Sequence, residues 1–259
     1  QKNTLTLGSL FDGSGGFPLG GLLAGVTPVW ASEIEPFPIR VTTRRFPSMK
    51  HYGDISQMDG GKIEPVDIIT FGSPCTDMSI AGKRAWLDGA QSSLFYQAIR
   101  IIKEMRCATN GRYPRWICWE NVVGAFSSNR GLDFKAVLEA VIGIAEPGAE
   151  VPMPPKDRWP YADIYMGERW SVAYRTFDAQ HWGVPQRRRR VYLVGDLAGQ
   201  CAGQVLFESE GLSGYSAEGF RSWQRAARDS AAGLGAAGGI CLNDQGGSCM
   251  DISFGVSGT

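Results

Sequence analysis

The sequence predicts an α/β fold in which a mostly parallel, twisted sheet carries helices on both faces. From Thr4 to Gly195 short apolar runs alternate with longer amphipathic segments, and this alternation is typical of βαβ units. A glycine-rich turn, residues 13–16, follows the first apolar run. Such a turn between a strand and a helix lets backbone amides come close to a ligand. The same two observations therefore predict the fold and one end of a site.

The individual elements follow from the same patterns. Strands are expected where short apolar runs occur: Leu5–Leu10, Val29–Ser32, Val66–Phe71, Trp116–Trp119, Val172–Asp178 and Arg190–Val194. Two segments repeat apolar residues every three or four positions, which predicts helices with one buried face over Leu94–Met105 and Leu132–Ile144. Pro147-Gly148 ends the second of them.

Composition limits the class of protein. The chain has 259 residues, 43% of them hydrophobic, which is enough for one sizeable core. Lys+Arg and Asp+Glu balance at 26 each, so any nucleic-acid surface must be local. Six cysteines without a CxxC pair and only two histidines make a metal site improbable and favour reduced thiols. No apolar run reaches the roughly 20 residues of a membrane span, so a cytoplasmic protein is expected.

The amino-acid composition changes after Gly195. Residues 226–239 are rich in Gly, Ala and Ser, which is typical of a flexible connector. We therefore expect one domain over residues 1–195 and a connector, with the start of a further region, over 196–259. The opening at Gln1 and the close at Thr259 suggest that a longer protein has been trimmed.

Acidic residues extend the glycine-rich end. The dinucleotide fingerprint GxGxxG fails because Pro18 stands where its third glycine is needed, which disfavours a nicotinamide enzyme. Glu33 ends the next strand about twenty residues later, where an acid commonly binds ribose hydroxyls. Asp54 follows in a His51–Asp54 turn. A solvated helix cap is the alternative for each acid.

A second set of polar residues follows the central strands. Cys75 closes the apolar run 66–71 through Gly72-Ser73-Pro74, and a reactive thiol here would lie where open α/β sheets hold their chemistry. Cys118 lies inside an apolar strand and is expected in the core. Glu120 follows the next run and is either a functional acid or a helix cap. In the Arg187–Arg190 run, strand alternation would send Arg188 and Arg190 to the same side.

These segments, taken in order, resemble the DNA (cytosine-5) methyltransferase family. The resemblance rests on Phe11 to Gly16, Gly72 to Cys75, Glu120-Asn121-Val122 and the Gln-x-Arg-x-Arg pattern of Gln186, Arg188 and Arg190, and it covers Leu5 to Gly195. It implies a Rossmann-like S-adenosylmethionine-dependent methyltransferase fold, S-adenosylhomocysteine as product and double-stranded DNA as partner. It also implies a monomeric bacterial or phage protein that binds neither metal nor membrane.

The resemblance implies a role for each matching residue. Cys75 would add as a thiolate to carbon 6 of a flipped cytosine, so that carbon 5 can take the methyl group. Glu120 would serve ring nitrogen 3 if burial raises its pKa, and Arg188 and Arg190 would contact the cytosine carbonyl and steady Glu120. S-adenosylmethionine would be held by Phe11, Asp12, Gly13, Gly15, Gly16, Glu33, Ile34, Asp54, Ile55, Gly72, Pro74 and Leu94. DNA would be contacted by Ser79, Lys83, Arg84 and Gln186.

The chain also departs from the family pattern. Thr76 and Gln91 replace a common glutamine and arginine, and nothing after Gly195 supplies a target-recognition domain or the final helix. A catalytically silent nucleic-acid-binding homologue and a tRNA cytosine-5 methyltransferase remain as alternatives. Intact Cys75, Glu120, Arg188 and Arg190 argue against the first. The recognition sequence and a role in restriction-modification are not readable from the motifs.

Overall fold

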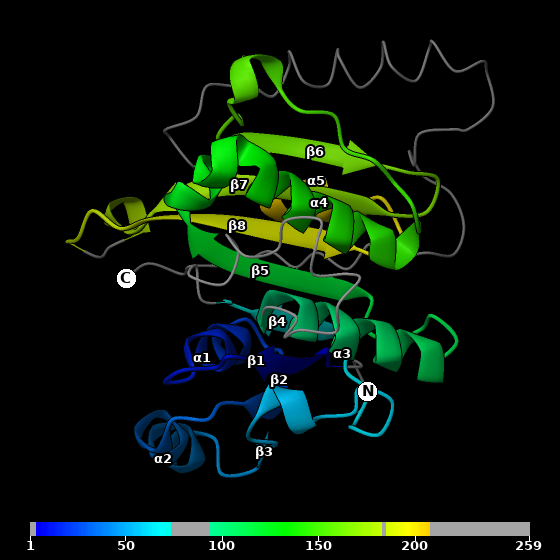
Figure 1. Cartoon of the computed structure of the whole chain (residues 1–259). Helices are drawn as coiled ribbons and strands as arrows, with labels where there is room; N and C mark the ends of the chain where they lie inside the picture. The colour runs from blue at the N-terminus through cyan, green and yellow to red at the C-terminus, as the bar shows by residue number, and fades with distance from the viewer. Residues whose placement is uncertain (1–3, 74–93, 183–184, 208–259) are drawn as a thin grey trace. The chain divides into compact units, whose positions relative to one another are not determined.

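The computed structural model describes residues 4–73, 94–182 and 185–207 (Figure 1). The chain divides into two compact units, and the described residues up to Leu206 belong to the first of them. The second unit, Phe207–Asp251, lies almost wholly outside the described residues. The domain boundary expected after residue 195 stays a prediction.

One eight-stranded sheet forms the centre of the first unit, in the order β3-β2-β1-β4-β5-β8-β7-β6. Strands β3, β2, β1, β4 and β5 are mutually parallel, whereas β8 is antiparallel to β5 and β7, and β6 is antiparallel to β7. This confirms the predicted mostly parallel α/β sheet. The strand bounds are β1 Thr6–Leu10, β2 Thr27–Ser32, β3 Lys50–His51, β4 Ile68–Phe71, β5 Trp116–Val122, β6 Ala162–Met166, β7 Ser171–Asp178 and β8 Arg189–Asp196.

Helices cover both faces of this sheet. In Figure 1, α4 crosses in front of β7 and β8, and the short α5 lies behind them. The helix bounds in the described residues are α1 Gly16–Leu23, α2 Pro36–Arg45, α3 Leu94–Ala108, α4 Leu132–Ala145 and α5 Ala202–Leu206, with 3-10 turns η1 Ile55–Gln57, η3 Val123–Phe126, η4 Ser128–Gly131, η5 Pro155–Asp157 and η6 Ala179–Trp182. The two helices predicted by periodicity, α3 and α4, are both present.

The core lies between the sheet and α3 and α4. Fully buried Trp119 of β5 packs on Phe134 of α4 with ring centroids 6.2 Å apart, and Phe134 packs edge-on against Tyr174 of β7 at 4.9 Å. Phe95 of α3 completes this aromatic layer with a 6.2 Å contact to Trp119. Because these rings bury large apolar areas, they fix α3 and α4 on one face of β5 and so hold its carboxyl end in place.

The structure adds two strands to those expected. The two-residue β3 and the half-buried edge strand β6 were not predicted, because neither forms an apolar run. Cys107 and Cys118, in the described part of the chain, are free thiols. None of the helices in the described part of the chain has the length and apolar character that a bilayer crossing needs.

Candidate functional site

The strand order creates a switch point between β1 and β4. The chain moves from β1 outward to β2 and β3, and then returns to the other side of β1 with β4 and β5. In open α/β sheets, the crevice at the carboxyl ends of two such strands is the usual ligand site. Here the glycine turn follows β1 and Gly72-Ser73 follows β4, so both predicted ends of the site meet at this crevice.

The glycine turn uses backbone conformations that few side chains tolerate. Phe11, Gly13 and Gly15 have φ angles of 54°, 58° and 87°, in the left-handed region that favours glycine. The turn is fixed to β2 because the Asp12 amide donates to the Ser32 carbonyl oxygen at 3.0 Å. Gly16 then begins α1, whose first amides have no partner within the helix. The turn therefore places the amino end of α1, with its first amides unpaired within the helix, at the switch point.

Glu33, which directly follows β2, is hydrogen-bonded to the glycine turn that follows β1. Its carboxylate accepts from the Gly13 amide at 2.7 Å and from the Ile34 and Glu35 amides at 2.8 and 3.0 Å. These bonds hold the carboxylate beside the glycine turn. The Ile34 side chain that follows is 66% exposed, so its apolar surface is open to contact with a ligand. Glu33 and Ile34 thus offer a carboxylate and an apolar surface side by side.

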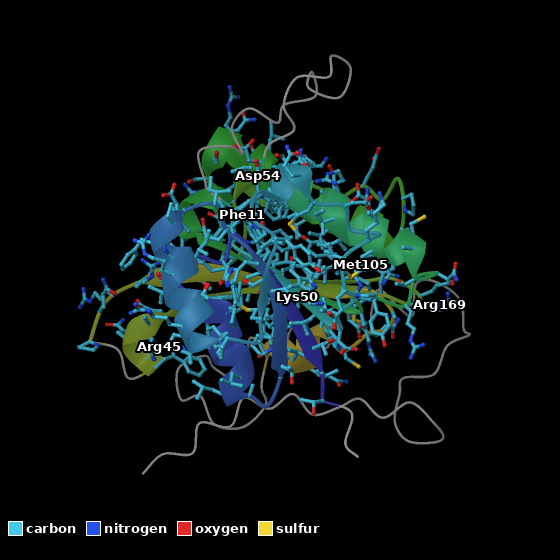
Figure 2. The ribbon with its side chains drawn as sticks, turned by 90° about the horizontal axis from the view of Figure 1, so that it is seen from below. Phe11, Arg45, Lys50, Asp54, Met105 and Arg169 are labelled. Carbon is cyan, nitrogen blue, oxygen red and sulfur yellow. The ribbon has the colours of Figure 1, made fainter. Side chains whose placement is uncertain are left out.

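The third predicted segment, Asp54–Ile55, joins the same region through Ser32. The Ser32 hydroxyl donates to the Gly53 carbonyl oxygen at 2.7 Å, so one serine is bonded to both the glycine turn and the Asp54 turn. Figure 2 shows Phe11 and Asp54 on the same side of the molecule. Asp54 caps η1 by accepting from the Ser56 amide at 2.8 Å, and that bond lowers the pKa of its carboxyl. The cap that was the alternative for Asp54 is therefore present.

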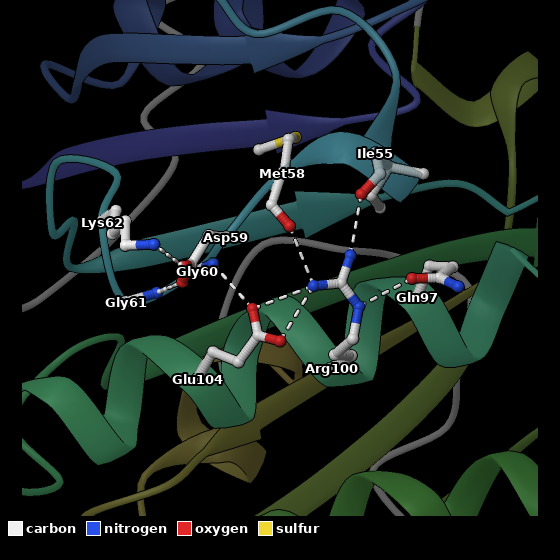
Figure 3. Close-up of polar contacts among 9 residues, drawn as sticks. All are labelled: Ile55, Met58, Asp59, Gly60, Gly61, Lys62, Gln97, Arg100 and Glu104. Carbon is white, nitrogen blue, oxygen red and sulfur yellow. Dashed lines mark hydrogen bonds and ion pairs between the residues drawn. The ribbon is translucent and has the colours of Figure 1, made fainter.

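Arg100 of α3 anchors the segment that follows Asp54, a role that no sequence motif predicted. Its guanidinium donates to the carbonyl oxygens of Ile55 at 2.8 Å and Met58 at 2.9 Å, and it pairs with Glu104 (Figure 3). Glu104 in turn accepts from the Gly60 amide at 2.7 Å. The only signal in the sequence was an Arg and a Glu four residues apart on one helix.

Asp12 is the most perturbed acid in the described residues. Burial raises the pKa of its carboxyl to about 6, and the nearby Glu33 carboxylate adds to that rise. The Ser9 hydroxyl lies close enough to lower the pKa in part, yet neither Asp12 oxygen lies within hydrogen-bond geometry of a partner. A buried carboxylate without partners is costly, and such groups concentrate at functional sites.

The segment that leads to Cys75 is held by β5. The Ser73 hydroxyl accepts from the Trp119 indole N–H at 3.3 Å, and the Ser73 carbonyl oxygen accepts from the Asn121 side-chain amide at 3.2 Å. Asn121 Oδ1 also accepts from the Val122 amide at 2.8 Å. Both Ser73 and Asn121 are buried, so these bonds fix the direction in which the chain leaves β4.

Glu120 and Arg190 meet at the carboxyl end of β5. Arg190 Nε lies 3.0 Å from Glu120 Oε1, and both side chains are about one-quarter exposed. Gly72 lies directly against Glu120: a Cβ atom there would be 3.2 Å from Glu120 Oε2. Glu120, the segment toward Cys75 and Arg190 therefore converge on one point, although Glu120 and Arg190 are seventy positions apart in the numbering.

The remaining arginines of the run divide between the two sides of β8, as alternation requires. Arg189 stacks its guanidinium 5.1 Å from the Tyr161 ring, whereas Arg188 and Arg190 influence Tyr192, whose pKa burial raises to about 12. Arg188 is exposed, as are Gln186 and Arg187. Cys118 is a free, partly buried thiol, and burial raises its pKa to about 12, as expected of a core cysteine that does not react.

Five predicted residues lie outside the described part of the chain: Pro74, Cys75, Ser79, Lys83 and Arg84. Their roles stay predictions. Leu94 is described as the first residue of α3, where it is partly buried against the core. Across the described ranges no cluster of three or more His, Cys, Asp or Glu side chains could hold a metal ion.

Comparison with known proteins agrees with this geometry. The profile of the C-5 cytosine-specific DNA methylase family matches residues 5–144, which is more than half of the chain. The chain belongs to this family. It is 32% identical to the type II methyltransferase M2.BsuMI of Bacillus subtilis, over 73% of this chain and 41% of that protein.

One relative has a name that specifies adenine. The DNA N-6-adenine-methyltransferase of Escherichia phage P1 is 33% identical over 73% of this chain and 28% of its own length. The chain thus spans well under half of either relative. A crystal structure described as a DNA modification methyltransferase encoded within an E. coli prophage matches with a TM-score of 0.50 at 21% identity, covering 74% of this chain and 47% of that one, and supports the fold alone.

Proposed function

We propose that this chain is the catalytic part of an S-adenosylmethionine-dependent DNA (cytosine-5) methyltransferase. The observation that carries the proposal is the Glu120–Arg190 pair. Glu120 lies against Gly72, where the chain leaves β4 toward Cys75, and β4 is the neighbour of β1, which the glycine turn follows. Family membership supports the same reaction class. Double-stranded DNA is the proposed partner of a monomeric, cytoplasmic protein.

The residues present fit the proposed cofactor. Exposed Ile34 beside Glu33 offers an apolar surface next to a carboxylate, which suits adenine and ribose. The unpaired first amides of α1 and the buried Asp12 carboxylate suit a charged amino-acid part. When bound, S-adenosylmethionine supplies a methyl group on a positively charged sulfur. We assign the pocket to Phe11, Asp12, Gly13, Gly15, Gly16, Glu33, Ile34, Asp54, Ile55, Gly72, Pro74 and Leu94.

We assign bond making to Cys75. Carbon 5 of cytosine is a weak nucleophile, and addition of the Cys75 thiolate at carbon 6 turns the ring into an enamine whose carbon 5 can accept a methyl group. A base then removes the proton from carbon 5, and the ring electrons expel the thiolate and restore aromaticity. The fixed Ser73 carbonyl supports this assignment, because it sets the direction of the chain immediately before Pro74 and Cys75.

Glu120, Arg188 and Arg190 would stabilise the negative charge that develops on the cytosine ring. As the thiolate adds, electron density moves to ring nitrogen 3 and the neighbouring carbonyl oxygen, so donors there lower the barrier. We assign nitrogen 3 to Glu120 and the carbonyl oxygen to Arg188, with Arg190 orienting Glu120 through the observed 3.0 Å contact. Ser79, Lys83, Arg84 and Gln186 would contact the DNA, with Arg187 as a further phosphate contact.

The test traps the covalent step. DNA in which 5-fluorocytosine broadly replaces cytosine should form an adduct with the wild-type protein that survives denaturation, because fluorine blocks loss of the carbon 5 substituent. Because 5-fluorocytosine then stands at cytosine positions throughout the DNA, the recognition sequence need not be known. Cys75→Ala should form no adduct and Cys118→Ala should form it normally. An adduct that persists without Cys75 contradicts the mechanism.

The product distinguishes the proposed reaction from its alternatives. Nucleoside mass spectrometry of DNA from cells that express the protein should find 5-methylcytosine that Cys75→Ala abolishes. N6-methyladenine in its place would favour the reaction named for the phage P1 relative. Methylated cytosine in transfer RNA alone would favour the RNA enzyme, and no methylation with retained DNA binding would favour a silent homologue.

A further inference from the structure

Trp182 ends a row of three aromatic rings that starts beside the candidate catalytic pair. Tyr192 of β8 lies opposite Glu120 in the β5–β8 register. Phe177 of β7 contacts Tyr192 edge-on at 5.7 Å, and Trp182 contacts Phe177 edge-on at 5.6 Å. Each ring is thus linked to the next, and the row leads from Glu120 outward to Trp182.

The row lies at the reactive edge of the sheet. Strand β8 is antiparallel to β5, so its first residues pair with the carboxyl end of β5. The β7–β8 connection that carries Trp182 therefore projects from that end, which Figure 1 shows on the left beside the tip of β5. Phe177 pairs with Arg190, and Tyr192 with Glu120, so these side chains share one face of the sheet.

The base of this connection is closed by hydrogen bonds. The Asp178 carboxylate accepts from the Arg188 amide at 3.1 Å and from the Gln180 amide at 3.3 Å. The Ala179 amide donates to the Arg188 carbonyl oxygen at 3.1 Å. These bonds tie the segment just before Trp182 to Arg188 at the start of β8.

The Trp182 side chain is nevertheless 44% exposed, and it is the one described tryptophan that ranks among the exposed large apolar side chains. Leaving an indole in water forgoes the burial that large aromatic rings normally gain. Cationic side chains are close in the chain, since exposed Arg187 and Arg188 follow within six positions. An exposed aromatic ring among arginines is the combination with which proteins stack unpaired bases along a phosphate backbone.

We propose that Trp182 stacks on an unpaired nucleobase at the DNA interface, next to the Glu120–Arg190 pair. The proposal rests on DNA as the substrate and adds a base contact that the catalytic assignment does not contain. The indole face receives the base, while Phe177 contacts the indole and is itself packed on Tyr192. A base stacked on an aromatic side chain gains a factor of roughly 5–150 in affinity.

The test uses three 24-base-pair duplexes: one has an unpaired cytosine, one has an abasic site at the same position, and one is fully paired. Binding is measured by fluorescence anisotropy at fixed low salt. The wild-type chain should prefer the unpaired cytosine by at least about fivefold. Trp182→Phe should keep most of this preference, and Trp182→Leu should abolish it. All variants should bind the fully paired duplex alike, because phosphate contacts dominate there.

Trp170 provides the matched control. It directly precedes β7, at the opposite end of that strand, and its indole donates to Glu146 at 2.7 Å. Trp170→Leu should leave the preference unchanged. Absence of a preference in the wild type, or its retention in Trp182→Leu, overturns the proposal. The 5-fluorocytosine adduct reports separately on the catalytic assignment, so a wild type that forms the adduct but ignores the unpaired base removes only the role of Trp182.

Discussion

The two halves of the site are assembled in different ways. At the carboxyl ends of β1 and β2, the Glu33 carboxylate accepts from the Gly13 amide, twenty positions earlier in the chain. It also accepts from the amides of the next two residues, Ile34 and Glu35. At the carboxyl end of β5, Glu120 forms an ion pair with Arg190 of β8, and Ser73 accepts hydrogen bonds from the Trp119 and Asn121 side chains. The first half uses short-range contacts to backbone amides, whereas the second uses side chains from strands that only the fold brings together. The second half should therefore be more sensitive to single side-chain changes.

The largest effect is expected at Glu120. Glu120→Gln keeps the shape but replaces the acid that the proposed mechanism needs, so turnover should fall by roughly 10²–10⁴. Calorimetric affinity for S-adenosylmethionine should stay within about twofold, since this residue lies on the other half of the site. Turnover is measured by methyl incorporation into DNA, with Glu146→Gln as a control. A parallel loss of cofactor affinity would erase the distinction between the two halves.

Asp12 should make stability depend on pH. Its folded-state pKa of about 6 lies above the ordinary 3.8, so its full contribution to stability is present below pH 3.8 and is lost as pH rises through about 6. A rise of roughly two pKa units corresponds to about 3 kcal/mol in the free energy of unfolding. Burial is the main cause, with the Glu33 carboxylate as the facing charge and the Ser9 hydroxyl as a partial offset.

Asp12→Asn removes this titration. Relative to the wild type, the variant should be more stable at pH 7 than at pH 4 by up to about 3 kcal/mol, as measured by urea unfolding at both pH values. A stability difference between the two proteins that is the same at pH 4 and pH 7 would refute the assignment to Asp12.

A smaller effect is expected at Glu33. In Glu33→Gln one carboxylate oxygen that accepts backbone amides becomes an amide nitrogen, which cannot accept them. Affinity for S-adenosylmethionine should fall about tenfold, as expected for loss of a charged hydrogen bond, while turnover at saturating cofactor changes little. Calorimetry on Glu33→Gln, with the neighbouring exposed Glu35→Gln as control, checks this. Equal losses in both variants would point to a general charge effect.

The smallest effect is expected at Gly72. In Gly72→Ala the new Cβ lies 3.2 Å from Glu120 Oε2, so the carboxylate must shift by a few tenths of an ångström. Turnover should fall by roughly threefold to tenfold, because catalysis is sensitive to small displacements. Gly124→Ala is the control, since its new Cβ would be 3.7 Å from Val122, an ordinary contact. No change in Gly72→Ala turnover would mean that the position of Glu120 tolerates movement.

Local patterns were enough for the parts of the fold that repeat within a few residues. Helices α3 and α4 follow from apolar spacing, and most strands follow from short apolar runs. Strand β6 was missed because its residues are half-buried and form no such run, and β3 because it has two residues. The antiparallel position of β8 between β5 and β7 is set by long-range pairing, which no local pattern encodes.

The sequence by itself determined the α/β class, the glycine turn with Glu33 and the motifs that identify the family, because those features depend on neighbouring residues and on residue type. The tertiary structure alone decided that Asn121 holds Ser73, that Arg100 supports the Asp54 segment and that Trp182 extends an aromatic row. It also gave a distance of 3.0 Å to the Arg190–Glu120 contact, which the family resemblance implied. These contacts join residues brought together by strand order and helix packing. Many alternative pairings are compatible with the same local patterns, and only packing of the whole core selects one.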